Sequence, residues 1–127
     1  MAQTAFSIAN VTFSGSIVEG FLAGSPVPVF FPQLTVNFQV FDRGPNHVAG
    51  LIATTDSWKT SQIVTAAFQG FGAGFEFWRA IYPASAGGPV APVTFEFVIF
   101  CDDFGGVDAV PRIWNTNGGS VFQERVS

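Results

Sequence analysis

The sequence has few of the residues on which metal sites and catalytic sites most often depend. Among its 127 residues, Cys101 is the only cysteine and His47 is the only histidine. A single cysteine cannot form a disulfide within the chain, which agrees with a reducing compartment. His47 has no second histidine or nearby cysteine with which to hold zinc, and nothing around Cys101 or any serine resembles a nucleophile elbow.

Charged residues are also scarce, with nine acids and five bases. Asp102, Asp103 and Asp108 lie around a Phe-Gly-Gly-Val segment, a pattern typical of a polar hairpin and too poor in oxygen ligands for a calcium loop. A glycosidase needs two opposed carboxyl groups in a cleft, which a domain this small seldom encloses. We therefore expect a protein that is not an enzyme and has no catalytic residues, no metal ion and no organic cofactor.

The five basic residues are spread singly along the chain, whose net charge is −4. Without a basic cluster, neither nucleic acid nor an anionic membrane is expected as a partner. No apolar run reaches the roughly 18–20 residues that a helix needs to cross a bilayer. The first residues lack the basic and apolar regions of a secretory signal, so we expect a cytoplasmic protein, or a secreted one if a leader has been removed.

What the sequence has in excess is phenylalanine, with 16 residues, in a chain that is 48% apolar. Apolar side chains alternate with others in residues 34–40, 75–80 and 94–100, as in half-buried β-strands. Glycine or proline interrupts the chain about every ten residues, and no window of eleven or more residues shows a helical period. The sequence predicts one domain over residues 1–127, an immunoglobulin-like antiparallel β-sandwich of about eight strands, with a small barrel as the alternative.

Trp58 is the tryptophan whose surroundings are most polar. It lies in the segment Thr-Thr-Asp-Ser-Trp-Lys-Thr, where the alternating pattern of the core does not place an indole. An exposed indole offers a flat apolar surface to the C–H face of a sugar ring, and Asp56 and Lys59 beside it can bond to sugar hydroxyls. The alternative is that the ring folds back as a lid on one end of the sandwich. Trp78 alternates with two phenylalanines and is expected in the core.

Trp114 stands at the end of a predicted strand, before the segment Asn-Thr-Asn-Gly-Gly. Either face of that strand can be the core face, so the pattern leaves the exposure of Trp114 open. The amides of Asn115 and Asn117 provide the donors and acceptors that adjacent sugar hydroxyls require. They equally suit a turn in which asparagine side chains bond to the backbone.

Three stretches of the chain together resemble a known family. They are VNFQVFDRGPNHVAGLIATTDSWKT (36–60), GFEFWRAIY (74–82) and TFEFVIFCDDFGGVDAVPRIWNTNGG (94–119). In this order they are similar to family 21 carbohydrate-binding modules, which are starch- and glycogen-binding domains. The resemblance covers roughly residues 34–126 and rests on an Asp-x-Trp-Lys segment, an aromatic strand and a closing aromatic-Asn-rich motif.

The resemblance implies a non-catalytic β-sandwich that binds α-glucan chains through exposed aromatic rings. By motif, Trp58 matches a stacking tryptophan of the family. Trp114 matches the aromatic residue of the closing motif, with Asn115 and Asn117 on its polar positions. Phe75 falls where some members place a tyrosine of a second site.

The sequence departs from the family at positions that bear on ligand choice. Most of the family's ligand tyrosines are phenylalanine here or absent, Asn115 stands in place of the usual Asp, and Phe122 replaces a tyrosine. Phenylalanine keeps the stacking surface and loses the hydroxyl that orients a sugar. A glycan other than starch, and weak binding, therefore stay open.

A different class of function competes with sugar binding. With 16 phenylalanines and a mean hydropathy of +0.39, the chain can have more apolar surface than one core hides. A homo-oligomeric structural or scaffold protein would bury that excess between subunits. The two hypotheses are compatible, because clustering weak sugar sites raises avidity.

Overall fold

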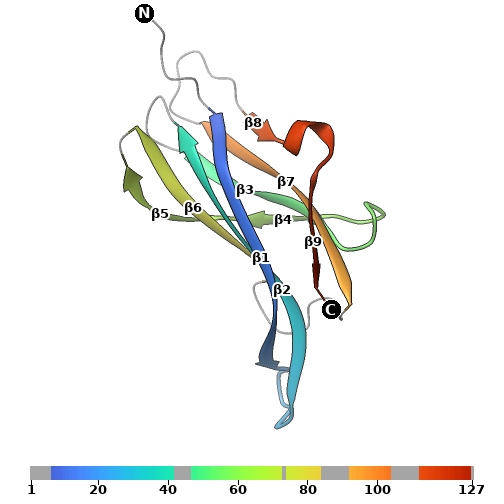
Figure 1. Ribbon diagram of the computed structural model, residues 1–127. Coiled ribbons are helices and arrows are strands. Elements are labelled where there is room, and N and C mark those ends of the chain that lie inside the picture. Colours follow the sequence, from blue (N-terminus) through green and yellow to red (C-terminus); the bar gives the residue numbers. More distant parts are fainter. Residues whose placement is uncertain (1–6, 42–46, 73, 84–91, 104–111, 127) are drawn as a thin grey trace, which may run out of the picture.

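The computed structural model describes residues 7–41, 47–72, 74–83, 92–103 and 112–126, which form two β-sheets packed against each other (Figure 1). All strand pairings are antiparallel. The predicted all-β antiparallel sandwich is therefore confirmed, with nine strands in the described residues where about eight were expected. The elements are β1 (Ser7–Phe21), β2 (Pro28–Phe41), β3 (His47–Thr54), β4 (Gln62–Thr65), β5 (Ala67–Gly72), β6 (Phe75–Tyr82), β7 (Val93–Asp103), β8 (Arg112–Asn115), the short 3-10 helix η1 (Asn117–Gly119) and β9 (Phe122–Val126).

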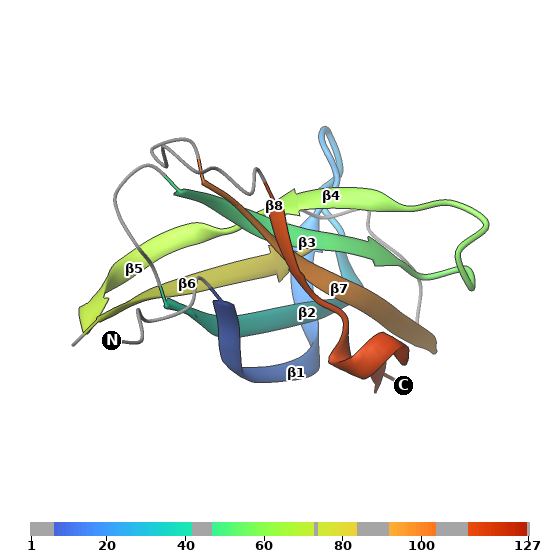
Figure 2. The same cartoon turned by 90° about the horizontal axis from the view of Figure 1, so that it is seen from above.

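The strands divide into a four-stranded and a five-stranded sheet, which we call sheet A and sheet B. Sheet A has the order β1-β2-β6-β5, and sheet B has the order β4-β3-β7-β8, with β9 also paired to β7. β8 pairs with β7 around Phe100, and β9 pairs with it around Phe95, so both lie along the side of β7 that faces away from β3. Seen from above, the two sheets form two layers (Figure 2).

The alternation of side chains along each strand determines which of them enter the core. Successive side chains of a strand point to opposite faces of its sheet, so every second residue of a central strand is buried between the layers. Trp78 is one of these core residues and is only 8% exposed, as the sequence pattern predicts. The innermost side chains are those of Leu34, Val36, Phe38 and Val40 in β2, Leu51 in β3, and Phe95, Phe97 and Ile99 in β7.

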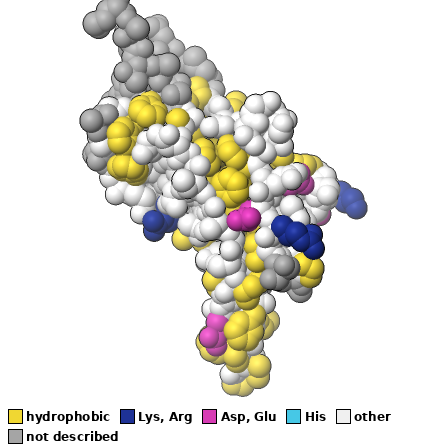
Figure 3. All heavy atoms as spheres, viewed as in Figure 1, with side chains coloured by type: hydrophobic (Ala, Val, Ile, Leu, Met, Phe, Trp, Pro, Cys, Tyr) yellow, Lys and Arg dark blue, Asp and Glu magenta, His cyan; other side chains and the backbone are white. Residues whose placement is uncertain are grey.

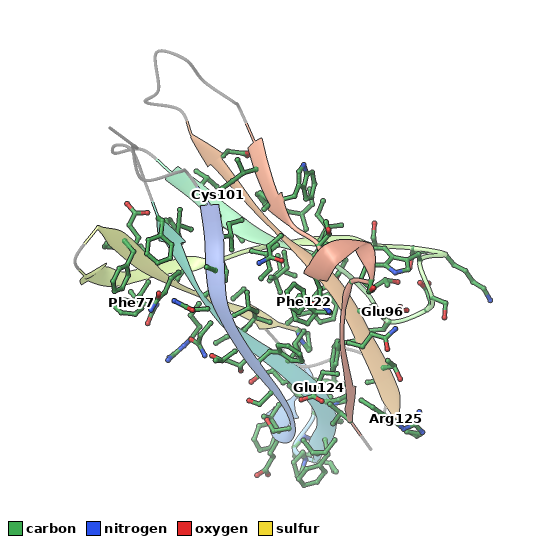
Figure 4. All side chains as sticks on the ribbon, turned by 45° about the horizontal axis from the view of Figure 1, so that its top comes forward. Phe77, Glu96, Cys101, Phe122, Glu124 and Arg125 are labelled. Carbon is green, nitrogen blue, oxygen red and sulfur yellow. The ribbon has the colours of Figure 1, made fainter. Side chains whose placement is uncertain are left out.

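Contacts between β1 and β9 close one side of the sandwich. The ring of Phe122 stacks on Phe97 with 5.2 Å between the centroids, and the ring of Phe13 meets both edge-on (Figure 4). Gly15 lets β1 pass this close to β9, because a Cβ at this position would collide with Cγ2 of Val126. Phe122 therefore packs against the core.

β1 and β2 reach beyond the rest of the sandwich as a two-stranded hairpin (Figure 1). β6 pairs with β2 only from Leu34 onward, so within the described part of the chain the hairpin beyond this point has no third strand. We call residues 16–33 the hairpin arm.

Candidate functional site

The two tryptophans that the sequence assigns to a ligand lie in and next to sheet B: Trp114 in β8, and Trp58 in the loop that follows β3. The alternation of β7 points Glu96, Val98 and Phe100 away from the core, since the residues between them are fully buried. Gly50 of β3 and Trp114 of β8 are the strand partners of Phe100. Paired side chains of antiparallel strands point to the same face, so Trp114 lies on the outer face.

The neighbours of Trp114 determine how its ring is presented. Phe100 is buried although it points outward, and Gly50 makes room for it, because a Cβ on Gly50 would lie 3.1 Å from Phe100 Cζ and would collide with the carbonyl oxygen of Val64. The rings of Phe100 and Trp114 lie 6.2 Å apart between centroids, tilted by 58°. Trp114 is 48% exposed, so much of its indole is open to a ligand.

Trp58 lies in the loop between β3 and β4, which folds over the outer end of sheet B. The loop is organised around the buried hydroxyl of Thr54, which accepts the backbone N–H groups of Asp56 at 3.2 Å and Trp58 at 3.1 Å. The Trp58 side chain is 40% exposed. The prediction that this indole is exposed, rather than folded back as a lid, therefore agrees with the structure.

The Asp56 carboxylate forms hydrogen bonds within the loop itself, whereas the sequence predicted bonds to sugar hydroxyls. Its Oδ2 accepts the hydroxyl of Thr60 at 2.6 Å, and its Oδ1 accepts the Thr60 backbone N–H at 2.9 Å. The Thr54 hydroxyl lies 2.7 Å from Oδ1 and 2.6 Å from the Thr60 carbonyl oxygen, either of which can accept its proton. The bonds from Thr60, and then that from Thr54, lower the pKa of Asp56 from 3.8 to about 2.

The backbone of this loop is strained where the indole is presented. Ser57 has φ of 59° and Trp58 has φ of 70°, in the left-handed region that bulky residues rarely adopt. Each such residue costs on the order of 1–3 kcal/mol and persists only where its surroundings impose it, most often at functional sites. Here the bonds to Thr54 and Asp56 impose it.

A polar hollow of about 500 Å³ lies next to the Trp58 loop on the same outer face. Glu96 of β7 accepts a hydrogen bond from the Gln123 amide of β9 at 3.1 Å, which ties two of the lining side chains together. Figure 4 shows Glu96 and Arg125 reaching outward from β7 and β9. The hollow is lined by Thr55, Ser57, Pro92, Val93, Thr94, Glu96, Gln123 and Arg125.

Sequence reasoning did not single out the polar residues of this hollow. The alternation of β7 indicates that Thr94 and Glu96 point outward. Gln123 and Arg125 join them only because β9 pairs with the first half of β7, and no local pattern in the sequence reports that pairing.

The two asparagines after Trp114 hold the chain around η1. The Asn115 amide donates to the carbonyl oxygen of Ile8 at 3.0 Å, and its Oδ1 accepts the backbone N–H of Asn117 at 3.0 Å. The Asn117 amide donates to the carbonyl oxygen of Val121 at 3.1 Å. Of the two roles that the sequence left open for these amides, the structure shows the turn role.

Two further residues assigned to the site lie in different places. Lys59 is exposed in the Trp58 loop. Phe75 is in β6 of sheet A, beside Phe41 with 5.5 Å between the ring centroids, and its ring lies over Gly72. The structure therefore does not bring Phe75 together with Trp58 and Trp114.

No three His, Cys, Asp or Glu side chains among the described residues are grouped so that they could hold a metal ion. Within the described ranges, no helix is long and apolar enough to span a bilayer. The side chains of His47 and Asp103, and all of Asp108, lie outside the residues that the structure describes.

No protein-family model matches the chain, and no curated protein sequence matches it.

Proposed function

We propose that this chain is a non-catalytic carbohydrate-binding protein and that its site is the outer face of sheet B. The observation that carries the proposal is the distribution of the three tryptophans. Trp78 is buried, whereas Trp114 is 48% exposed on the outer face of sheet B, and Trp58 is 40% exposed in the loop whose backbone bonds to Thr54 at the end of that sheet. An exposed indole is costly in water, and stacking on the C–H face of a sugar is a use that suits its shape.

The spacing of the two indoles favours a chain of sugars over a single ring. Trp114 lies level with Gly50 of β3, and the backbone N–H of Trp58 binds the side chain of Thr54, four residues further along the same strand. At about 3.3 Å per residue, these levels are roughly 13 Å apart. Val98 of β7 and Ile52 of β3 form the face between these two levels.

The polar hollow supplies the hydrogen-bonding groups that a sugar chain needs. Glu96 can accept from sugar hydroxyls, Gln123 can donate and accept, and Arg125 and Lys59 can donate. The resemblance to starch-binding modules favours an α-glucan as the ligand. For a shallow site of this kind, we expect dissociation constants in the micromolar to millimolar range, about −8 to −4 kcal/mol.

Affinity electrophoresis of the purified chain in gels that contain amylose, glycogen or β-glucan tests this proposal. Wild-type protein should be retarded in at least one glucan gel. Trp58→Ala and Trp114→Ala should each weaken retention about tenfold, which corresponds to about 1.4 kcal/mol. Ile81→Ala is the control, because Ile81 is a large apolar residue that is 38% exposed in β6 of sheet A, away from this face and from the hairpin arm. Migration unchanged in all three glucans, with no binding on a glycan array, would reject the proposal.

The hairpin arm favours a second candidate function, that of a homo-oligomeric structural protein. Large apolar side chains are exposed along it, and Figure 3 shows them covering much of its surface. Glu19 is the only charged residue between positions 16 and 33. The exposed apolar residues are Ile17, Phe21, Leu22, Val27 and Phe30.

The open edges of the arm indicate what could cover it. A two-stranded ribbon is marginally stable in water, and its unpaired backbone groups favour pairing with another strand. Insertion into lipid is disfavoured, because those backbone groups would find no partner in hydrocarbon. A second copy of this chain provides both a strand edge and an apolar face, so we propose arm-to-arm contact between subunits.

The molecular mass in solution tests the assembly role separately from sugar binding. If the arm mediates assembly, wild-type protein should sediment as an oligomer, and a Phe21→Asp/Phe30→Asp double variant should sediment as a monomer. Trp58→Ala should keep the wild-type mass. A monomeric wild type at tens of micromolar would reject the assembly role.

A further inference from the structure

A second hollow, of about 480 Å³, lies on the outer face of sheet A, on the opposite side of the molecule from Glu96 and Arg125 (Figure 4). Its rim differs from the rest of the sheet surface, because amides and an arginine surround an exposed phenylalanine. The lining residues are Asn10, Thr12, Asn37, Phe38, Gln39, Gln69, Phe77, Trp78 and Arg79.

Two irregularities in otherwise regular strands converge on this hollow. The pairing of β1 with β2 shifts register between Ala9 and Thr12, and the pairing of β5 with β6 shifts between Phe68 and Gly70. Asn10 lies in the first irregularity with φ of 52°, and Gln69 lies in the second. Bulges re-aim side chains and are over-represented next to functional sites. Here each bulge brings one amide to the same rim from opposite edges of the sheet.

Hydrogen bonds between strands fix the polar groups in place. The Asn10 amide donates to Gln39 Oε1 at 2.6 Å, and Arg79 Nε donates to Asn37 Oδ1 at 2.9 Å. Both bonds hold a long side chain against the sheet. They leave the Gln39 amide nitrogen and the two terminal nitrogens of the Arg79 guanidinium for a ligand.

Phe77 provides a flat apolar surface beside these groups. Its strand partner in β5 is Gly70, which has no side chain to cover the ring, and Phe77 is 40% exposed. Gly70 has φ of 147°, a conformation that residues with a Cβ rarely adopt. The ring of Phe75 packs edge-on against the ring of Phe77, with 4.9 Å between the two centroids. An exposed ring among fixed amides is suited to stacking against a sugar.

The charge of the rim indicates the kind of sugar. Arg79 is a cation, and none of the described residues that line the hollow is acidic. The hollow on sheet B, by contrast, contains Glu96. A guanidinium binds a carboxylate through two parallel hydrogen bonds. We propose that the outer face of sheet A binds an acidic sugar, with the carboxylate on Arg79, the hydroxyls on the surrounding amides and the ring on Phe77.

This site is independent of the neutral-glucan site on sheet B, and the experiment separates the two. Galacturonate oligosaccharides and the matching neutral galactose oligosaccharides are titrated into the full chain by calorimetry. The acidic oligosaccharide should bind at least about tenfold more tightly than the neutral one, and binding should weaken as salt is added. Arg79→Gln should remove that preference, and Phe77→Ala should weaken binding of the acidic oligosaccharide.

Trp58→Ala is the control, and it should bind the galacturonate oligosaccharide like the wild type. Arg79 is exposed, so thermal unfolding should show Arg79→Gln as stable as the wild type, while Phe77→Ala should still unfold in one cooperative transition. The proposal is overturned if the wild type does not bind the galacturonate oligosaccharide, if it binds the neutral counterpart equally well, or if Arg79→Gln binds like the wild type. None of these results bears on glucan binding at Trp58.

Discussion

Thr54 and Asp56 together shape the loop that presents Trp58. The Thr54 hydroxyl is buried and accepts two backbone N–H groups, while the Asp56 carboxylate accepts a hydroxyl and an N–H from Thr60. Hydrogen bonds to an ionised carboxylate are stronger than those between neutral groups. The charge on Asp56 therefore holds the left-handed backbone at Ser57 and Trp58, and with it the orientation of the indole.

The lowered pKa of Asp56 leads to a testable prediction about a single residue. Its folded value of about 2 lies below the ordinary 3.8, so the carboxylate stabilises the loop fully above about pH 4 and loses this effect as the pH falls toward 2. A titration of the side-chain carboxyl by NMR should give a pKa near 2. Thr60→Val, which lacks the donor hydroxyl, should move that pKa upward toward 3.8.

The exposed neighbour Ser61 provides the control for this titration. Ser61→Ala should leave the pKa of Asp56 where it is in the wild type. An Asp56 that titrates near 3.8 in the wild type would contradict the hydrogen bonding described for the loop.

Some single-residue roles could be predicted from the sequence and others could not. Polar surroundings correctly indicated an exposed Trp58, and alternation with phenylalanine correctly indicated a buried Trp78. The engagement of Asp56 and Asn115 with the backbone was not predicted as the favoured role. A carboxylate or amide in a turn uses the same atoms to bind a ligand or to hydrogen-bond with the backbone. Only the conformation of the loop determines which of these two roles it has.

At the scale of elements, the crossing of β1 over β9 is the contact that closes the sandwich. Gly15 Cα faces Val126, and its backbone N–H donates to Glu124 Oε2 at 3.1 Å, so β1 approaches β9 without a side chain between them (Figure 4). Close packing at this position leaves no room for an added methyl group.

Gly15→Ala should therefore destabilise the protein. The new Cβ would collide with the Val126 side chain and would lie 3.1 Å from Glu124 Cγ, and such overpacking typically costs about 1–3 kcal/mol. Urea denaturation measures the change. Ser14→Ala, at the neighbouring exposed position, should stay within about 0.5 kcal/mol of the wild type. Equal stability of Gly15→Ala and the wild type would show that β1 does not pass this close to β9.

Strands could be predicted from period-two patterns, but their partners could not. The pattern of β6 correctly places Phe75, Phe77 and Arg79 on one face and Trp78 on the other. The two bulges that aim Asn10 and Gln69, and the pairing of β9 with β7, depend on contacts between distant segments. The polar groups of both hollows were for this reason missed.

At the scale of the whole molecule, three surfaces lie apart from one another. The outer face of sheet B and the loop next to it carry the two exposed indoles, the outer face of sheet A carries amides around Phe77, and the hairpin arm carries exposed apolar side chains. Because the faces of a sandwich are separated by its core, a substitution on one should not alter ligand binding on the other. Additivity of Trp58→Ala and Phe77→Ala in thermal stability would support this separation.

An NMR titration with maltoheptaose tests directly whether glucan chains bind at Trp58 and Trp114. It follows the three indole N–H signals, which are assigned with single Trp→Phe variants. Trp58 and Trp114 should shift together and saturate. Trp78, whose indole N–H donates to Glu76 Oε1 at 3.0 Å in the core, should not move. If the signals of Trp58 and Trp114 stay in place at millimolar maltoheptaose, and again with glycogen- and β-glucan-derived oligosaccharides, the outer face of sheet B does not bind glucan chains.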